Sequence, residues 1–319
     1  MKQPHSSPQA YGTRRVFLQD GSLLMLAGAA GLAVGPSSDA DQFHQAPADD
    51  EVVRFALITD LHYADKEAAG TRHYRETPAK LSQAAEQWRA EKPDFLAVLG
   101  DLIDAAKDVQ TELGYLRQIR GELDKIELPK HYVLGNHCVD TLTKQEFLNG
   151  VGQEKSYYSF DQGNVHFVVL DACFRSDGVS YQRKNFEWTD PNIEKREVDW
   201  LRKDLADTDK PTIVLVHQRL DVEGPYGIKN AAAVRNVLES SGKVLAVFQG
   251  HSHENEHRMI KGIHYCTLVA MVEGAFEDSN GFSVASVYQD GTIRLSGFRQ
   301  QDSYHWRGPS LPSQPNSPA

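Results

Sequence analysis

The stretch EVVRFALIT, residues 51–59, is an apolar run rich in β-branched side chains, and it leads directly into Asp60-Leu61-His62. This pattern is typical of a buried strand that delivers its last residues to a loop. A carboxylate and an imidazole two residues apart at such a point are candidate metal ligands. The stretch therefore predicts a strand with part of a metal site at its end.

The same arrangement recurs along the chain. Apolar runs at 95–99, 130–134, 212–216 and 244–248 lead to Gly100-Asp101-Leu-Ile-Asp104, Gly135-Asn136-His137, His217 and Gly250-His251-Ser-His253, respectively. Loops at one rim of a sheet bring together residues that are distant in sequence. The clusters together supply carboxylate, imidazole and amide ligands for two metal ions, which predicts a hydrolytic metal centre.

Helical patterns alternate with these strands. We predict helices at 77–92, 108–126, 193–206 and 230–239, the first with Thr77 as N-cap and Pro78 at its first position. Further strands are predicted as a hairpin at 157–160 and 165–170, and at 263–272, 282–288 and 292–297. A length of 319 residues suits a single α/β domain, placed at residues 51–300.

Composition limits the partners of this domain. Hydrophobic residues make up 40% and charged residues 24% of the chain, as in soluble globular proteins. The formal net charge of −10 provides no diffuse attraction to polyanions, so no stable nucleic-acid binding is expected. The three cysteines have no CxxC spacing, which indicates neither a thiolate zinc site nor a disulfide framework.

The N-terminal segment 1–46 is interpreted as a targeting signal and linker. TRRVFL, residues 13–18, resembles the twin-arginine export signal, and a weakly apolar region at 21–35 follows it. This predicts the twin-arginine export machinery as a partner, a periplasmic or extracellular location in a bacterium, and no membrane span in the mature chain. A membrane anchor or a chance arginine pair is the alternative, because Gln19 and Asp20 depart from the usual basic tail. The Pro/Ser-rich tail, residues 309–319, is predicted to be disordered.

The ordered set of clusters from Asp60 to His253 resembles the calcineurin-like metallophosphoesterase family. The resemblance implies a β-sandwich of two mixed sheets flanked by α-helices, with two divalent ions (manganese, iron or zinc) at the strand ends. By the same resemblance one ion is held by Asp60, His62, Asp101 and His253, and the other by Asp101, Asn136, His217 and His251. Asp101 would bridge the ions, and a hydroxide between them would attack phosphorus.

Two further residues have roles implied by the resemblance. His137 matches the histidine that protonates the departing alkoxide, and Asp104 matches the acid that orients this imidazole. The alternatives are that His137 packs beside the site and that Asp104 is a helix N-cap. Cys138 stands where relatives usually have Asp or Glu, and it is interpreted as a small buried side chain that fills space.

The substrate is the least determined feature. The polar loop at 171–192 contains Arg175, Tyr181 and Arg183 together with Lys184, Phe186 and Trp188, a mixture that could clamp a phosphate and stack a base or sugar. Arg175, Tyr181, Arg183 and His257 are candidate substrate contacts, although the loop's aromatic side chains could instead anchor it to the core. A phosphomonoester, a phosphodiester and a nucleotide pyrophosphate all remain open as the small phosphorylated substrate. The pattern also resembles the manganese-dependent ADP-ribose and CDP-alcohol pyrophosphatase branch, and non-catalytic binding of a metal or phosphate ligand is the alternative function.

Overall fold

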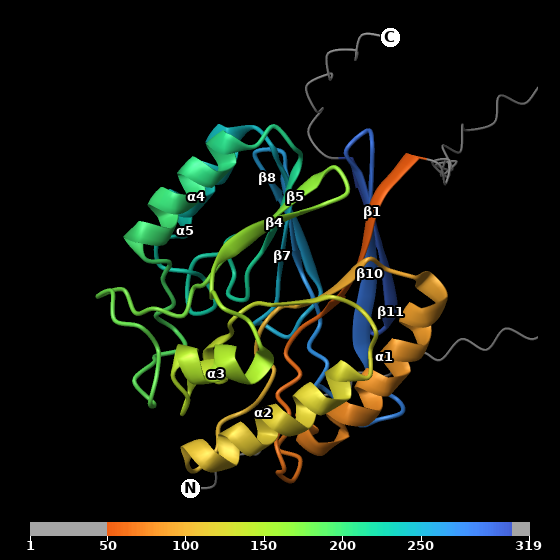
Figure 1. The fold of residues 1–319 in the computed structure, drawn as a ribbon, viewed down its shortest axis with the longest axis vertical. Helices are drawn as coiled ribbons and strands as arrows, with labels where there is room; N and C mark the ends of the chain where they lie inside the picture. The colour runs from red at the N-terminus through yellow and green to blue at the C-terminus, as the bar shows by residue number, and fades with distance from the viewer. Residues whose placement is uncertain (1–49, 308–319) are drawn as a thin grey trace, which may run out of the picture. The chain divides into compact units, whose positions relative to one another are not determined.

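The computed structural model describes residues 50–307. The predicted signal segment (1–46) and the predicted disordered tail (309–319) lie outside the described residues, so both stay predictions. Two six-stranded sheets, each flanked by helices, form the described part of the chain (Figure 1). This confirms the predicted fold class.

Each sheet mixes parallel and antiparallel neighbours. The first has the order β12-β11-β10-β1-β2-β3, with β1 (Glu51–Ile58) parallel to β2 (Phe95–Val98) and antiparallel to β10 (Gly281–Tyr288). Its other strands are β3 (Lys130–Tyr132), β11 (Thr292–Arg299) and β12 (Tyr304–Arg307). The second has the order β4-β5-β6-β7-β9-β8, and these strands are Tyr158–Gln162, Val165–Val169, Thr212–Leu215, Val244–Gln249, Ile263–Thr267 and Glu256–Ile260, respectively.

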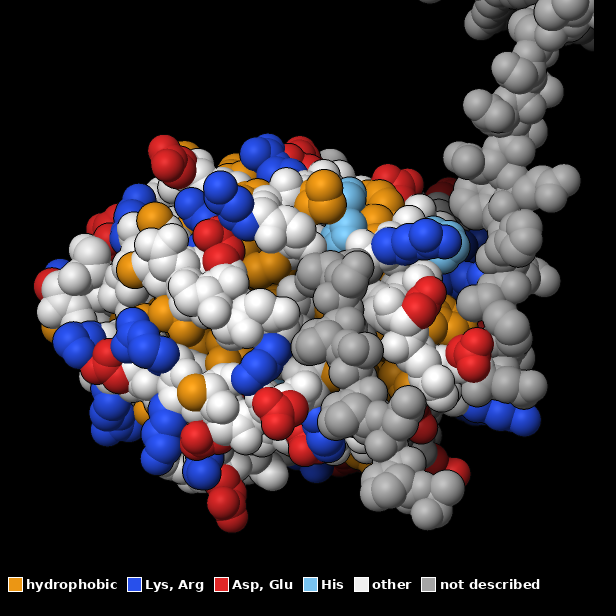
Figure 2. All heavy atoms as spheres, turned by 90° about the horizontal axis from the view of Figure 1, so that it is seen from above, with side chains coloured by type: hydrophobic (Ala, Val, Ile, Leu, Met, Phe, Trp, Pro, Cys, Tyr) orange, Lys and Arg blue, Asp and Glu red, His pale blue; other side chains and the backbone are white. Residues whose placement is uncertain are grey.

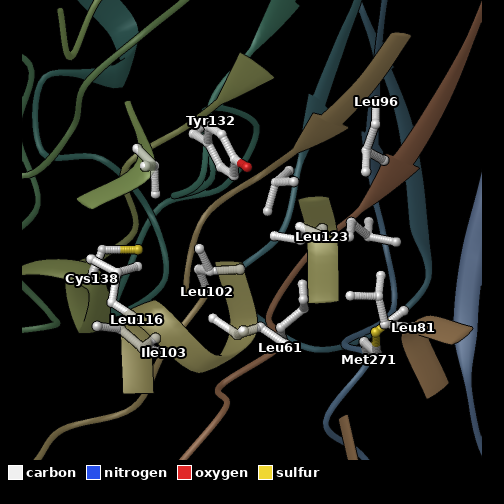
Figure 3. Close-up of a cluster of buried hydrophobic side chains, with 14 of the residues drawn as sticks. Leu61, Leu81, Leu96, Leu102, Ile103, Leu116, Leu123, Tyr132, Cys138 and Met271 are labelled. Carbon is white, nitrogen blue, oxygen red and sulfur yellow. The ribbon is translucent and has the colours of Figure 1, made fainter. Parts of the chain in front are cut away.

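Helices cover the outer faces of both sheets (Figure 1). α1 (Thr77–Glu91), α2 (Val109–Asp124) and α3 (Lys144–Val151) pack with the first sheet in one apolar cluster, part of which Figure 3 shows. α4 (Lys195–Asp207) and α5 (Ala231–Ser241) pack on the second sheet. Between the sheets lies a further core, in which the Phe55 ring stacks on Phe95 and meets Phe167 and Phe248 edge to face.

This layering explains why the strands at the centre of the sandwich read as continuous apolar runs. In β1, Phe55 and Leu57 face the core between the sheets, whereas Ala56 and Ile58 face the helices, and all four are buried. A strand that is covered on both faces needs apolar side chains at every position. The run that predicted β1 therefore follows from its place between two apolar layers.

The structure differs from the predicted elements at several points. α1 begins after Glu76, and the Thr77 hydroxyl donates to Leu61 O instead of capping the helix, so the N-cap prediction is wrong. β8, β12 and α3 were not predicted. The capping box formed by Thr143 and Glu146 is a sequence pattern that indicates the start of α3. β12 pairs with β11 and so extends the domain past residue 300.

Charges on the surface are mixed. Acidic and basic side chains lie interspersed over the face drawn in Figure 2. Among residues 50–307, no helix has the length and apolar character needed to cross a bilayer.

Candidate metal centre

The five sequence clusters meet at one rim of the sandwich, where the loops after β1, β2, β3, β6 and β7 come together. Three groups of side chains there each have ligand atoms within 4.8 Å of one another. Asp60, His62 and His253 form the first, Asp101, His217 and His251 form the second, and His62, Asp101 and His137 form a third that overlaps both. The first two groups each draw residues from loops of both sheets. The structure therefore brings together six of the seven predicted ligands, and Asn136 lines a cavity together with Asp101, His251 and His253.

Asp101 lies between the two groups. Its Oδ2 atom is 3.6 Å from His62 Nε2 on one side and 3.1 Å from His217 Nε2 on the other. In the first group, His253 Nε2 lies 3.3 Å from Asp60 Oδ1 and 3.2 Å from His62 Nε2. One carboxylate thus faces both clusters, which is the geometry that a shared ligand requires.

The donor atoms of the site suit two cations. Buried atoms of four of these residues have no hydrogen-bond partner within the described part of the chain: Asp60 Oδ1, Asn136 Oδ1, His217 Nε2 and His251 Nε2. Buried polar atoms normally have partners, and bound cations would supply the partners that these four atoms lack. Oxygen and imidazole donors without sulfur suit manganese, iron or zinc, so the residues present fit two divalent ions.

Neighbouring groups fix which ring nitrogen faces the centre. His217 Nδ1 lies 2.7 Å from Leu99 O and donates to it, so Nε2 is the ring nitrogen that faces the centre. Burial, and next the charge of His217, lower the pKa of His251 to about 3, so its imidazole is neutral at physiological pH. A neutral imidazole is the form that binds a metal.

The carboxylates of the centre attract positive charge. Although burial opposes ionisation, His217 and His253 hold the pKa of Asp60 well below its usual range. Burial likewise opposes the charge of His217, yet Asp101 and Asp60 raise its pKa to about 9. These opposing shifts describe a buried site that stabilises cations, whether protons on imidazoles or metal ions.

Glu273, which no sequence motif predicted, also contacts the site. Its Oε1 lies 2.6 Å from His253 Nδ1, so the carboxylate orients the imidazole with Nε2 toward Asp60. The hydrogen bond with His253 is the main reason that the pKa of Glu273 falls to about 2. A carboxylate behind a metal-binding histidine fixes the tautomer and raises the basicity of the ligand. No local motif marks Glu273, because it lies twenty residues beyond His253.

Replacing Glu273 with Gln is expected to weaken metal binding about 10- to 100-fold without unfolding the protein, because His253 loses the charge that holds its tautomer. Titration of metal-free protein with manganese, followed by the electron paramagnetic resonance of the free ion, measures this. Glu122→Gln is the matched control, since Glu122 lies on α2 and pairs with Lys125, outside the metal centre. Unchanged affinity in Glu273→Gln would refute the orienting role.

The ligand loops are anchored to the apolar core by the residues that alternate with the ligands. Leu61 separates Asp60 from His62, Leu102 follows Asp101, and both leucines are buried in the cluster of Figure 3. Cys138, in the short helix η3 (Asn136–Val139), is fully buried in the same cluster, as expected. Because these side chains point into the core, their neighbours are held facing the cavity.

Motif glycines permit the close packing of these loops. A Cβ on Gly250 would collide with Thr59 Oγ1 and Asp60 Oδ2, and a Cβ on Gly135 would collide with Asp101. Instead, the backbone approaches directly, so that His251 N donates to Asp60 Oδ2 at 3.0 Å and His137 N donates to Asp101 Oδ1 at 2.8 Å. Small residues before the ligands are therefore a packing requirement of the centre.

A buried polar network joins the loops after β6 and β7. Arg219 donates to both carboxylate oxygens of Asp221 and to the hydroxyl of Ser252, which separates His251 from His253. Gln249 donates to Asp221 and accepts from the Leu220 backbone. The two histidines have left-handed backbones, with φ of 72° and 64°. Such conformations persist where the surroundings determine them, and this network provides those surroundings.

His137 and Asp104 form a pair at the edge of the centre. His137 Nδ1 lies 2.7 Å from Asp104 Oδ1, and the imidazole lines the cavity. Although burial works against the imidazolium, Asp101 and Asp104 raise the pKa of His137. The N-cap of α2 is Asp108, whose side chain accepts from Thr111 N, so Asp104 does not cap this helix.

A cavity of about 310 Å³ opens onto the centre. Besides metal-site residues it is lined by three side chains from other loops: Arg72, Trp188 and Tyr226. Trp188 belongs to the loop at 171–192, which contains neither helix nor strand, as predicted. Arg72 and Tyr226 were missed because neither stands in a recognisable motif.

The four predicted substrate contacts do not line this cavity. Tyr181 is fully buried, and its hydroxyl donates to Glu187 O. Arg175 pairs with Asp177, and Arg183 donates to Thr141 O and pairs with Glu146. His257 stacks on Trp306 and contacts His264 on the neighbouring strand. Each of these side chains has structural partners, and none of the four lines the cavity that opens onto the centre.

The two-sheet sandwich with two Asp/His groups at one rim defines the class of metal-dependent phosphoric-ester hydrolases. The chain belongs to the calcineurin-like phosphoesterase family, whose model matches residues 53–255. The chain is therefore a metal-dependent hydrolase, as predicted, and two divalent ions are its cofactors.

Individual relatives are similar over most of the chain. A manganese-dependent ADP-ribose/CDP-alcohol diphosphatase from Xenopus laevis is 25% identical over 326 aligned residues, covering 80% of this chain and 91% of the relative. A protein of the same description from Oryza sativa subsp. japonica is 23% identical, covering 78% and 92%. The crystal structure of a dimetal phosphatase from Danio rerio has a TM-score of 0.72 at 22% identity, covering 82% of this chain and 100% of that chain. The last likeness shows the shared fold.

Proposed function

We propose that the protein hydrolyses the diphosphate linkage of a small nucleotide derivative with manganese as the metal. The relatives described as manganese-dependent ADP-ribose/CDP-alcohol diphosphatases support this choice among the predicted substrate classes. The observation that favours it in the structure is Arg72. Its guanidinium lines the cavity beside the metal centre and has no ion pair among residues 50–307, so it is available to a second phosphate group.

The ligand assignments follow the two groups. Asp60, His62, Asp101 and His253 hold one ion, and Asp101, Asn136, His217 and His251 hold the other. When bound, two divalent ions activate water and neutralise the charge of phosphoryl oxygens. The neutral amide of Asn136 keeps the negative charge of the second group low, since Asp101 is the only carboxylate in that group.

The protein's own groups then position the substrate and manage the leaving group. Arg72 binds the second phosphate group of the diphosphate, the one whose phosphorus is not attacked. His137 donates a proton to the leaving oxygen, and Asp104 holds its Nδ1 so that Nε2 carries the transferable proton. The chain has His137 in addition to all the predicted ligands. This argues against the alternative of a non-catalytic binding protein, because binding alone requires no proton donor.

Arg72 provides the test of the diphosphate proposal. In a panel containing ADP-ribose, CDP-choline, p-nitrophenyl phosphate and its bis ester, with manganese added, the highest kcat/KM is expected for the diphosphates. Arg72→Ala should lower kcat/KM for diphosphates about 10- to 100-fold and for p-nitrophenyl phosphate much less, because only the former present a second phosphate.

Arg175→Ala is the matched control, since Arg175 is also in a loop but pairs with Asp177 away from the cavity. Equal losses on both substrates in Arg72→Ala would contradict the anchoring role. If the wild-type protein prefers a monoester or a diester, the diphosphate proposal fails, although the metal-dependent hydrolase remains.

We further propose export through the twin-arginine route, on the basis of Arg14 and Arg15. A reporter fused behind residues 1–50 is expected to reach the periplasm of a bacterial host and to remain inside when both arginines are replaced by Lys. Fractionation of the cells measures this. Replacement of Lys2, the other basic residue of this segment, by Gln is the control. Export that survives the double arginine change would refute the proposal.

A further inference from the structure

Two large aromatic side chains stand exposed at the mouth of the metal cavity. Trp188 and Tyr226 are each 44% exposed, although both line that cavity. They come from separate loops, yet their ring centroids lie 5.5 Å apart. Both also approach the His251 ring, at 6.3 Å and 5.8 Å. The pair therefore forms one aromatic surface directly beside a predicted metal ligand.

Anchoring of the loop does not explain the exposure of Trp188. Two other aromatic side chains of the same loop serve that purpose: Tyr181 is buried, and Phe186 packs against it with a centroid distance of 5.4 Å. Trp188 instead remains open to solvent beside the reacting groups. Exposed apolar surface at a cavity is characteristic of a ligand-binding site.

The backbone that presents the two rings is well held. Lys184 Nζ donates to Ala106 O, and Arg183 ties the loop at 171–192 to Thr141 and Glu146. The second loop is closed by hydrogen bonds between Arg219 and Tyr226 and between Ile228 and Arg219, while Lys229 N donates to Pro191 O and joins the two loops. The rings are thus presented on ordered backbone, which lowers the entropy lost on binding.

We propose that Trp188 and Tyr226 form a stacking site for the base of a nucleotide substrate and determine the preference for base-bearing phosphates. This inference rests on the proposed function, of which it names the recognition element. Bases present a flat π-face to aromatic side chains, and such stacking is tolerant of base identity. Arg72 lines the same cavity, and its backbone pairs with that of Glu273, whose carboxylate contacts His253. A ligand that joins a planar ring to two phosphates could therefore use the rings, the metal centre and Arg72 together.

Binding is measured without turnover through tryptophan fluorescence. Of the four tryptophans, Trp88 and Trp306 are buried and Trp200 packs on Tyr157, so Trp188 is the one that is largely exposed. Titration of the full chain with AMP is expected to quench this emission. Ribose 5-phosphate, which has the same phosphate but no base, is expected to leave it unchanged. Tyr226→Ala should weaken the AMP response about 5- to 100-fold.

Kinetics provide an independent readout. Trp188→Ala and Tyr226→Ala are expected to raise KM for ADP-ribose about 5- to 100-fold, with a much smaller effect on ribose 5-phosphate or inorganic pyrophosphate. Trp188→Phe should restore most of the loss, because it keeps a ring. Met259→Ala is the matched control, since Met259 is an exposed apolar residue on β8 that does not line the cavity.

The outcomes separate the two proposals. Base-dependent quenching that Tyr226→Ala weakens supports the stacking site, even if the wild-type enzyme hydrolyses no diphosphate and the proposed function fails. Equal quenching by AMP and ribose 5-phosphate overturns the stacking site. So do equal losses on base-bearing and base-free substrates in both alanine variants.

Discussion

Replacing Asp101 with Ala is expected to cause the largest loss of any single substitution in this protein, about 10³-fold or more in kcat/KM together with the loss of both metal ions. Its carboxylate faces His62 in one group and His217 in the other, so a single substitution removes a ligand from both groups. Elemental analysis after gel filtration, combined with the hydrolysis of p-nitrophenyl phosphate, measures both effects.

The control for this variant is Asp199→Ala, because Asp199 is an exposed carboxylate on α4 that pairs with Lys195 and Arg202. It should keep the wild-type metal content and activity. Retention of two ions per chain in Asp101→Ala would show that the carboxylate is not shared. Thermal unfolding of the variant distinguishes local loss of metal from a failure to fold.

Replacing His137 with Ala is expected to lower kcat about 10²- to 10⁴-fold while both metal ions stay bound, because a proton donor is lost and no ligand is removed. The loss should depend on the leaving group. A p-nitrophenolate leaves readily without protonation, so its esters should lose less activity than substrates with an alkoxide or phosphate leaving group. The comparison of kcat across such a series measures the role.

A loss that is equal for good and poor leaving groups would contradict the proton-donor role of His137. Asp104→Asn should reproduce part of the effect, since the amide still contacts Nδ1 but no longer supports a positive imidazole. His305→Ala, on the edge strand β12, serves as the histidine control.

The metal centre could be predicted from sequence because its residues stand where strands end. Asp60 follows β1 and His217 follows β6, and a buried strand followed by a polar ligand is a local pattern. Glu273 has no such pattern. Its backbone is held by Lys80, whose ammonium donates to the carbonyls of Met271, Glu273 and Gly274 from α1, more than 190 residues away in the chain. A contact of this kind depends on tertiary packing.

The kinds of side chain that line the cavity were predicted, but the individual residues were not. Tyr181 and Trp188 stand in one irregular loop with similar chemistry, yet the first is buried and the second exposed. An irregular loop has no periodicity, so its sequence does not reveal which side chains face inward. Arg72 and Tyr226 were missed for the same reason, because both lie between regular elements.

The way in which each ligand group spans the two sheets has a thermodynamic consequence. Asp60 and His62 follow a strand of the first sheet, and His253 follows a strand of the second; the other group is divided in the same manner. Ions that bind these groups must be released when the sheets separate, so unfolding and metal dissociation are linked equilibria. The melting temperature of the enzyme is therefore expected to rise with free metal concentration.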